Sequence, residues 1–283
     1  GRLADAIGPR RVFFWGTVTF VVAGLAAGLA QSGGILLAAR ALQGAGGALC
    51  ATAALAIVSA LFEGRRRGAA LGVWAGVSAM GLGLGPLIGA ILTEGLAWQW
   101  VFLVNVPLGV LILLVAHKAI PELGGGDSIT TLPLAGLLFA TGAVVALLLA
   151  LTEGQRLGWS SPWVAGVGAG AIVSVLLFVR HESRREVRLV DARLAQSPAF
   201  RAANFVSLLS TAVMCNLFFF LSLFFQLALG YSALEAGASL LPLTAVIVIA
   251  APIAGRVSDK IGPRLPISGG MALLGLALLA LAL

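Results

Sequence analysis

Two short charged stretches in an otherwise apolar chain carry nearly the same residues. GRLADAIGPRR occupies positions 1–11 and GRVSDKIGPRL occupies positions 255–265, and seven of the eleven positions are identical. Each stretch sets one carboxylate, Asp5 or Asp259, among basic side chains. Such a carboxylate can pair with an arginine or accept hydrogen bonds from a free helix N-terminus. A cluster of this kind can form in one conformation and break in another, as a gate must, although a static anchor of topology fits the residues equally well.

Eight residues of the two stretches make up the predicted gate. Glycine permits a tight reversal of the chain and a close approach of two helices, and the basic residues hold the turn at the membrane surface. The eight residues are Gly1, Asp5, Gly8, Arg10, Gly255, Asp259, Lys260 and Arg264.

Arg40 is the one ionisable side chain set well inside a predicted span. A charge at the centre of a membrane helix costs about 2.5–3.5 kcal/mol even on the lenient insertion scale, which favours a functional role. Arg40 lies several residues from one end of its span, so a side chain that reaches out to the interface is the alternative.

Other polar and small residues inside apolar runs are weaker candidates. Asn216 and Gln226 are predicted to line a substrate cavity, with hydrogen bonds between helices as the alternative. Glycines at a spacing of four, at 68, 72 and 76 and again at 81, 85 and 89, predict a flat face for helix packing. Because no His/Cys/Asp/Glu cluster and no nucleophile–base pair is visible, we expect no metal, no cofactor and no enzymatic activity.

The composition indicates which kind of structure holds these residues in place. Sixty per cent of the residues are hydrophobic, ten per cent are charged, and the mean hydropathy is +1.05, so the charged residues cannot cover a water-soluble surface. The apolar runs are continuous rather than alternating and exceed the length that crosses a bilayer, which favours helices over barrel strands. The sequence therefore predicts an all-α polytopic membrane protein with about nine spans, at 12–30, 34–62, 68–93, 101–118, 131–152, 163–180, 202–228, 235–254 and 266–283.

Basic residues alternate between the loops. Of the 18 Lys and Arg residues, 16 fall in one set of alternate loops, Arg156 alone falls in the other set, and Arg40 lies inside a span. The positive-inside rule places the first set, with both charged stretches, in the cytoplasm of a multi-pass protein of the cell (inner) membrane. The net charge of +7 therefore reflects topology, and no nucleic-acid partner is expected. Eight spans separate the two stretches, so they face the same side, as in transporters built from two parallel repeats.

These stretches resemble the major facilitator superfamily. Its loop between the second and third helices has a Gly, an Asp four residues later, a Gly three further on, and then basic residues, as in Gly1, Asp5, Gly8 and Arg10. The basic residue that often follows the Asp is Ala6 here, whereas Lys260 takes that place in the second stretch.

Two further motifs carry the resemblance. RALQGAGGA is similar to the family's second motif at Arg40, Gln43 and Gly44, which implies a role of Arg40 and Gln43 in proton coupling. The residues that resemble the family's antiporter motif, which implies export in exchange for protons, are Gly81, Gly85, Pro86 and Gly89. The string WQWVFLVNVPLG and the two extra spans between the stretches resemble the fourteen-helix drug:proton antiporters of the EmrB/QacA type.

The resemblance implies two pseudo-symmetric helical halves with an inserted central pair. We expect a partial N-terminal half at 1–120 (helices 3–6), the inserted pair and a cytoplasmic linker at 121–200, and a partial C-terminal half at 201–283. The chain begins at Gly1 inside a motif and ends at Leu283 inside an apolar run, so we expect a fragment that lacks two helices before it and three after it.

The predicted function is proton-coupled multidrug efflux by alternating access. The implied partners are a small amphipathic substrate, protons that supply the energy, and the lipid bilayer, with a periplasmic adaptor left open. A symporter or importer on the same fold is one alternative, and a membrane protein without transport activity is the other.

Overall fold

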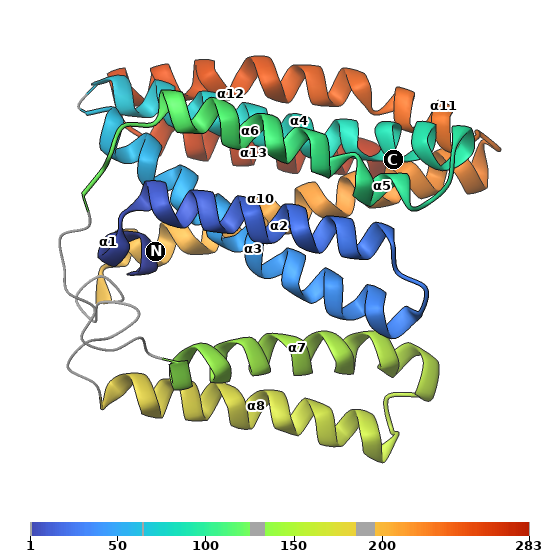
Figure 1. The fold of residues 1–283 in the computed structure, drawn as a ribbon. Helices are drawn as coiled ribbons and strands as arrows, with labels where there is room; N and C mark the ends of the chain where they lie inside the picture. The colour runs from blue at the N-terminus through green and yellow to red at the C-terminus, as the bar shows by residue number, and fades with distance from the viewer. Residues whose placement is uncertain (1, 64, 125–133, 185–195, 283) are drawn as a thin grey trace. The chain divides into compact units, whose positions relative to one another are not determined.

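The computed structural model describes residues 2–63, 65–124, 134–184 and 196–282, and this part of the chain is helical almost throughout, without a strand (Figure 1). It divides into two compact units, residues 1–127 with 209–283, and residues 128–208. The first unit contains α1 (Arg2–Ile7), α2 (Pro9–Gly28), α3 (Gly33–Leu61), α4 (Arg65–Gly95), α5 (Trp100–Leu103), α6 (Asn105–Ala119), the π-helical segment η1 (Phe224–Ala228), α11 (Ala233–Ser239), α12 (Leu241–Ile261) and α13 (Arg264–Ala282). The second unit contains α7 (Leu134–Leu157) and α8 (Pro162–Ser183), and α10 (Pro198–Leu223) runs from the second unit into the first.

Within the described residues, eight helical stretches are long and apolar enough to cross a membrane. They are Pro9–Gly28, Gly33–Leu61, Arg66–Gly95, Trp100–Ala119, Ala135–Leu157, Pro162–Ser183, Pro198–Ala228 and Ala233–Ile261. They follow the first eight predicted spans, so the predicted all-α polytopic membrane fold is confirmed. The ninth predicted span, 266–283, is helical as α13, but its described apolar stretch, Arg264–Ala280, is shorter and does not count among the eight.

The helices expose large apolar side chains and bury small ones. Leu37, Leu138 and Leu227 are 73%, 70% and 81% exposed, whereas Ala23 and Ala53 are fully buried. Lipid tails are as apolar as leucine, so these exposed side chains suit a bilayer and give no drive for helix association. Close packing of small residues must therefore hold the helices together.

The two charged stretches form the same backbone turn. Gly8 has φ 92° and Gly262, its equivalent in the second stretch, has φ 83°. Both values lie in the region that favours glycine, because other residues are strained there. A proline follows in each copy: Pro9 is the first residue of α2, and Pro263 immediately precedes α13. The sequence repeat is therefore a structural repeat of helix, glycine turn and helix.

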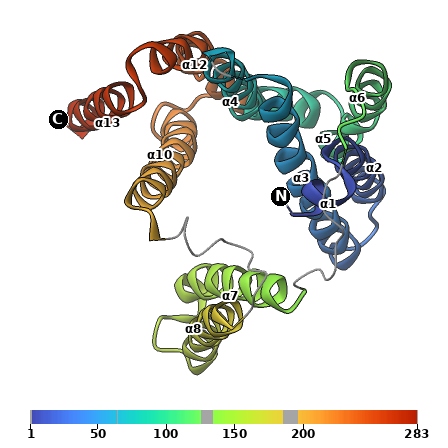
Figure 2. The ribbon, with the colours of Figure 1, turned by 90° about the vertical axis from the view of Figure 1, so that its left-hand side faces the viewer.

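Helices α4 and α12 lie side by side in contact through their backbones (Figure 2). A Cβ atom placed on Gly72 would lie 2.7 Å from the Ala251 carbonyl oxygen and 3.0 Å from the Pro252 Cα. A Cβ on Gly255 would collide with the Gly68 carbonyl oxygen. The predicted packing role of the glycines at 68, 72 and 76 is thus confirmed.

The second set of glycines lies on a different face of α4. A Cβ placed on Gly81, Gly85 or Gly89 would meet no described atom within 4 Å. Gly83 lies between them in sequence and faces Thr244 of α12 instead. The sequence predicts one flat face, and the structure has two. Gly81 follows Gly76 by five residues instead of four, and each extra residue turns the helix by about 100°, so the second set faces a different direction.

In the second unit, α7 and α8 form an antiparallel hairpin. Gly142 of α7 faces Ser174 of α8, and Gly154 faces the indole ring of Trp159 in the connecting turn. Phe139 and His181 meet edge to face, with their ring centroids 5.9 Å apart. Two of the predicted spans, 131–152 and 163–180, thus pair with each other.

We predict that Gly72→Ala lowers the thermal unfolding midpoint of the protein in detergent, whereas Gly81→Ala does not. The added methyl group at position 72 meets backbone atoms, which cannot turn aside, and overpacking of this kind costs about 1–3 kcal/mol. The same substitution at position 81 supplies the matched control, since both replacements lie in α4. Equal midpoints for the two variants would contradict the proposed helix contact.

Candidate functional site

Arg40 and Gln43 lie one turn apart on α3 and form a hydrogen-bonded pair. The Arg40 Nη1 donates to Gln43 Oε1 at 2.7 Å. The guanidinium carbon of Arg40 also lies 5.5 Å from the ring centroid of Phe102 in α5, which is a cation–π distance. Gln43 is 2% exposed, so the pair anchors an exposed cation to a buried amide.

The pocket for the Gln43 amide depends on a glycine of α2. A Cβ placed on Gly24 would lie 3.2 Å from Gln43 Nε2 and 3.5 Å from the Phe102 carbonyl oxygen. The Asn105 side-chain amide donates to the carbonyl oxygens of Val101, at 3.0 Å, and Phe102, at 3.2 Å, where α5 meets α6. Three helical elements therefore hold the pair in place.

Sequence reasoning missed two of these contributors, Phe102 and Gly24. Phe102 stands in the quoted string WQWVFLVNVPLG, but an aromatic residue among many gives no signal of its partner. Gly24 is one of 37 glycines, and only the packing of α2 on α3 distinguishes it.

In the first charged stretch, Arg10 makes the contacts. Its Nη1 donates to Glu122 Oε1 at 2.8 Å and its Nη2 donates to the His117 carbonyl oxygen at 2.9 Å. The guanidinium also lies 5.8 Å from the ring centroid of Phe14. Arg10 thus holds the C-terminal end of α6, where carbonyl groups lack helical partners and favour a cation. The Asp5 carboxylate is exposed and has no polar partner among the described residues.

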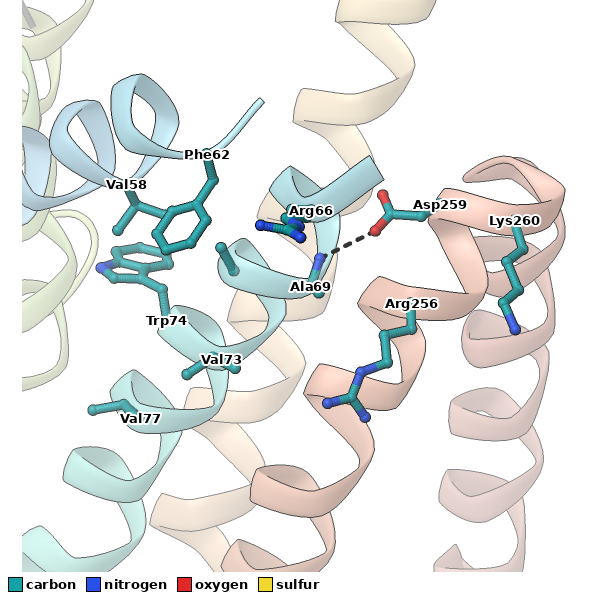
Figure 3. Close-up of a pocket in the computed structure, with 11 residues that line it drawn as sticks. Val58, Phe62, Arg66, Ala69, Val73, Trp74, Val77, Arg256, Asp259 and Lys260 are labelled. Atoms are coloured by element: carbon teal, nitrogen blue, oxygen red, sulfur yellow. Dashed lines mark hydrogen bonds between the residues drawn. The ribbon is translucent and has the colours of Figure 1, made fainter. Parts of the chain in front are cut away.

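In the second charged stretch, Asp259 makes the contact. Its Oδ2 accepts a hydrogen bond from the Ala69 backbone N–H at 3.2 Å, at the start of α4 (Figure 3). Ala69 is the fifth residue of α4, so the carboxylate lies near the N-terminal end of the helix, where the helix dipole favours a negative charge. Gly255 lies one turn before Asp259 and meets Gly68, which lets the carboxylate reach α4.

The other predicted gate residues are less engaged. Lys260 and Arg264 form no ion pair within the described part of the chain, and Figure 3 shows Lys260 directed away from Asp259. Gly8 supplies the turn, and Gly1 lies outside the described residues. The residues that sequence reasoning missed here are Ala69, His117 and Glu122, which lie far from their partners in sequence.

The cavity candidates bond within their own helices. Asn216 Nδ2 donates to the Ala212 carbonyl oxygen at 2.7 Å. Gln226, in η1, donates to the Ser222 carbonyl at 3.2 Å and to the Ser222 hydroxyl at 3.0 Å. Both side chains are exposed. Their role in a substrate cavity stays a prediction, as does the antiporter role of Gly81, Gly85, Pro86 and Gly89.

This helical membrane protein repeats one charged turn at two helix pairs, and it carries an arginine inside a span. Such an internal repeat is a feature of secondary transporters. The chain belongs to the Major Facilitator Superfamily, whose family model matches residues 1–128 and 131–283.

Curated relatives match nearly the whole chain. Multidrug resistance protein Stp of Mycobacterium tuberculosis is 33% identical over 293 residues, covering 99% of this chain and 52% of the relative. The methylenomycin A resistance protein of Streptomyces coelicolor is 32% identical over 282 residues, covering 99% and 59%. The cephamycin export protein CmcT of Amycolatopsis lactamdurans is 38% identical over 253 residues, covering 88% and 52%. The chain thus spans about half the length of these relatives.

We predict that Arg10→Ala destabilises the protein by about 1–3 kcal/mol, because it removes a charge-assisted hydrogen bond and leaves the His117 carbonyl without its donor. Arg11→Ala is the matched control: Arg11 is exposed, and substitutions at such positions stay within about 0.5 kcal/mol. Denaturant unfolding of both purified variants in detergent measures the difference. A loss for Arg11→Ala as large as that for Arg10→Ala would refute the structural role of this contact.

Proposed function

We propose that the protein exports drugs or other small amphipathic compounds in exchange for protons, by alternating access. The observation that carries this proposal is the set of relatives. Between 88% and 99% of this chain aligns with proteins described as multidrug resistance, methylenomycin A resistance or cephamycin export proteins. Because the chain spans about half of those relatives, the transporting unit is the whole protein.

The finer assignment is to the fourteen-helix drug:proton antiporters. Its support is the hairpin of α7 and α8, which lies in sequence between the two copies of the charged turn. In this assignment, residues 1–120 and 201–283 belong to the two halves of the transporter, and 121–200 hold the inserted pair and linker. The loops rich in arginine face the cytoplasm, as the distribution of 16 of the 18 basic residues favours.

Asp259 is the central residue of the proposed cytoplasmic gate. It lies on α12, in the segment assigned to the C-terminal half, and it accepts a hydrogen bond from Ala69 of α4, in the segment assigned to the N-terminal half. When two such halves rock against each other, a contact across them forms in one state and breaks in the other. The hydrogen bond to Ala69 therefore stabilises the state in which the cytoplasmic side is closed. Asp5 occupies the equivalent position in the first repeat.

We predict that Asp259→Asn slows export about tenfold or more while the protein stays in the membrane. A hydrogen bond to a charged group contributes about 1.5–3 kcal/mol, which corresponds to a shift of roughly 10–100-fold between the two states. Efflux of a fluorescent dye from bacteria that lack other exporters measures the rate, and immunoblotting of membranes measures the amount. Asp5→Asn tests the equivalent carboxylate. Unchanged efflux in Asp259→Asn would defeat the gate proposal.

Arg40 is the proposed residue of proton coupling, with Gln43 as its hydrogen-bond partner. A guanidinium remains protonated at all physiological pH values, so it does not itself carry the transferred proton. Its charge instead sets the electrostatic field around the pair, and Gln43 and Phe102 hold that charge in place.

We predict that Arg40→Ala and Arg40→Gln abolish proton exchange but preserve substrate binding. Inside-out vesicles with an imposed pH gradient provide the measurement: substrate added to vesicles with the wild-type protein should partly collapse the gradient, and either variant should leave it intact. Normal exchange in Arg40→Gln would mean that the side chain only reaches for the interface. A gradient that the wild-type protein leaves untouched would refute proton-coupled export itself.

A further inference from the structure

An open groove of about 840 Å³ lies beside the Asp259 contact in the first unit (Figure 3). Three helices line it: the end of α3, the beginning of α4 and the end of α12. The lining residues are Val58, Phe62, Arg66, Ala69, Ala70, Val73, Trp74, Val77, Arg256, Asp259 and Lys260.

The groove carries a surplus of positive charge. Three cations, Arg66, Arg256 and Lys260, line it together with one carboxylate, Asp259. That carboxylate already accepts the Ala69 N–H. No ion pair in the described residues engages the three cations, so their charge is available to an anion.

The rest of the lining is apolar. Val58 of α3 and Phe62, which directly follows α3, gather with Val73, Trp74 and Val77 along one side of α4. The basic residues of α12 lie toward its other side (Figure 3). From Arg66 to Val77 the helix rises about 16 Å, so the apolar strip runs from the charged helix end into the span. A ligand that matches both parts has an anionic head and a long apolar tail.

We propose that this groove binds an anionic phospholipid. The phosphate lies near Arg66 and Arg256, and an acyl chain lies along Phe62, Val73 and Val77. The inference rests on the orientation in the proposed function, which puts this end of the helices in the cytoplasmic leaflet, where anionic lipids gather and basic pockets between helices bind their head groups.

The bound lipid has a consequence for the gate. Since its binding site includes residues of both α4 and α12, the lipid binds only while these helices are together, and it stabilises that arrangement by mass action. The lipid content of the membrane thereby sets the balance between the closed and open states of the cytoplasmic side.

The test uses the full-length protein, purified and delipidated in detergent. Phosphatidylglycerol, phosphatidylcholine of the same chain length and inorganic phosphate are titrated separately, and the thermal unfolding midpoint and the lipid retained in native mass spectra are recorded. We expect phosphatidylglycerol to raise the midpoint and to be retained, and the other two to do neither. Equal protection by phosphatidylcholine would show a non-specific lipid shell, and equal protection by inorganic phosphate would show a simple anion site; either result overturns the proposal.

Variants locate the site. The double variant Arg66→Gln, Arg256→Gln should weaken phosphatidylglycerol binding roughly thirtyfold, from the contribution of each basic residue near an anionic lipid. Arg11→Gln, at an exposed basic position outside the groove, should bind as the wild type does. Equal affinity in the double variant would overturn the proposal, and if that variant does not fold, the single variant Arg66→Gln replaces it. Lipid binding is measured without transport, so the two proposals can fail separately. If the wild-type protein binds phosphatidylglycerol but exports no substrate, only the proposed function is refuted.

Discussion

The close approach of α4 and α12 is the contact on which the candidate gate and the groove depend. It exists because Gly68, Gly72 and Gly255 have no side chains, which lets two helix backbones touch. In lipid, where exposed leucines give no drive for association, such packing has to supply the attraction between helices. The contact brings the Asp259 carboxylate to the Ala69 N–H near the start of α4 and sets Arg66 and Arg256 along one groove.

The two charged stretches show how much a repeat determines. Both adopt a glycine turn with positive φ, at Gly8 and Gly262, because the residues that demand it are identical. Their contacts differ: Arg10 holds the end of α6, whereas Asp259 accepts the Ala69 N–H near the start of α4. A turn is specified by its own residues, while its partners belong to segments more than 100 positions away, so similar stretches take up different roles.

Much of the fold could be predicted from the sequence, because long apolar runs and glycine–proline breaks act locally. Eight spans and the pairing of Arg40 with the nearby Gln43 are of this kind. The contacts of Arg40 with Phe102 and of Arg10 with Glu122 could not be predicted, since they depend on which helix faces lie together. For the same reason the sequence predicts one glycine face on α4 where the structure has two: spacing alone does not say which neighbour each glycine meets.

The first unit is built from two parts of the chain, and this sets the order of its assembly. Ala69 and Asp259 are separated by 190 positions, with the α7–α8 hairpin between them in sequence. At a synthesis rate of about 5–20 residues per second, α4, which ends at Gly95, is complete roughly 7–30 s before the residues of α12 are made. During that interval the glycine face of α4 has no α12 to pack against. The newly made protein therefore passes through a stage in which the contact between α4 and α12 has not yet formed, and the membrane must tolerate the uncovered glycine face of α4 until α12 arrives.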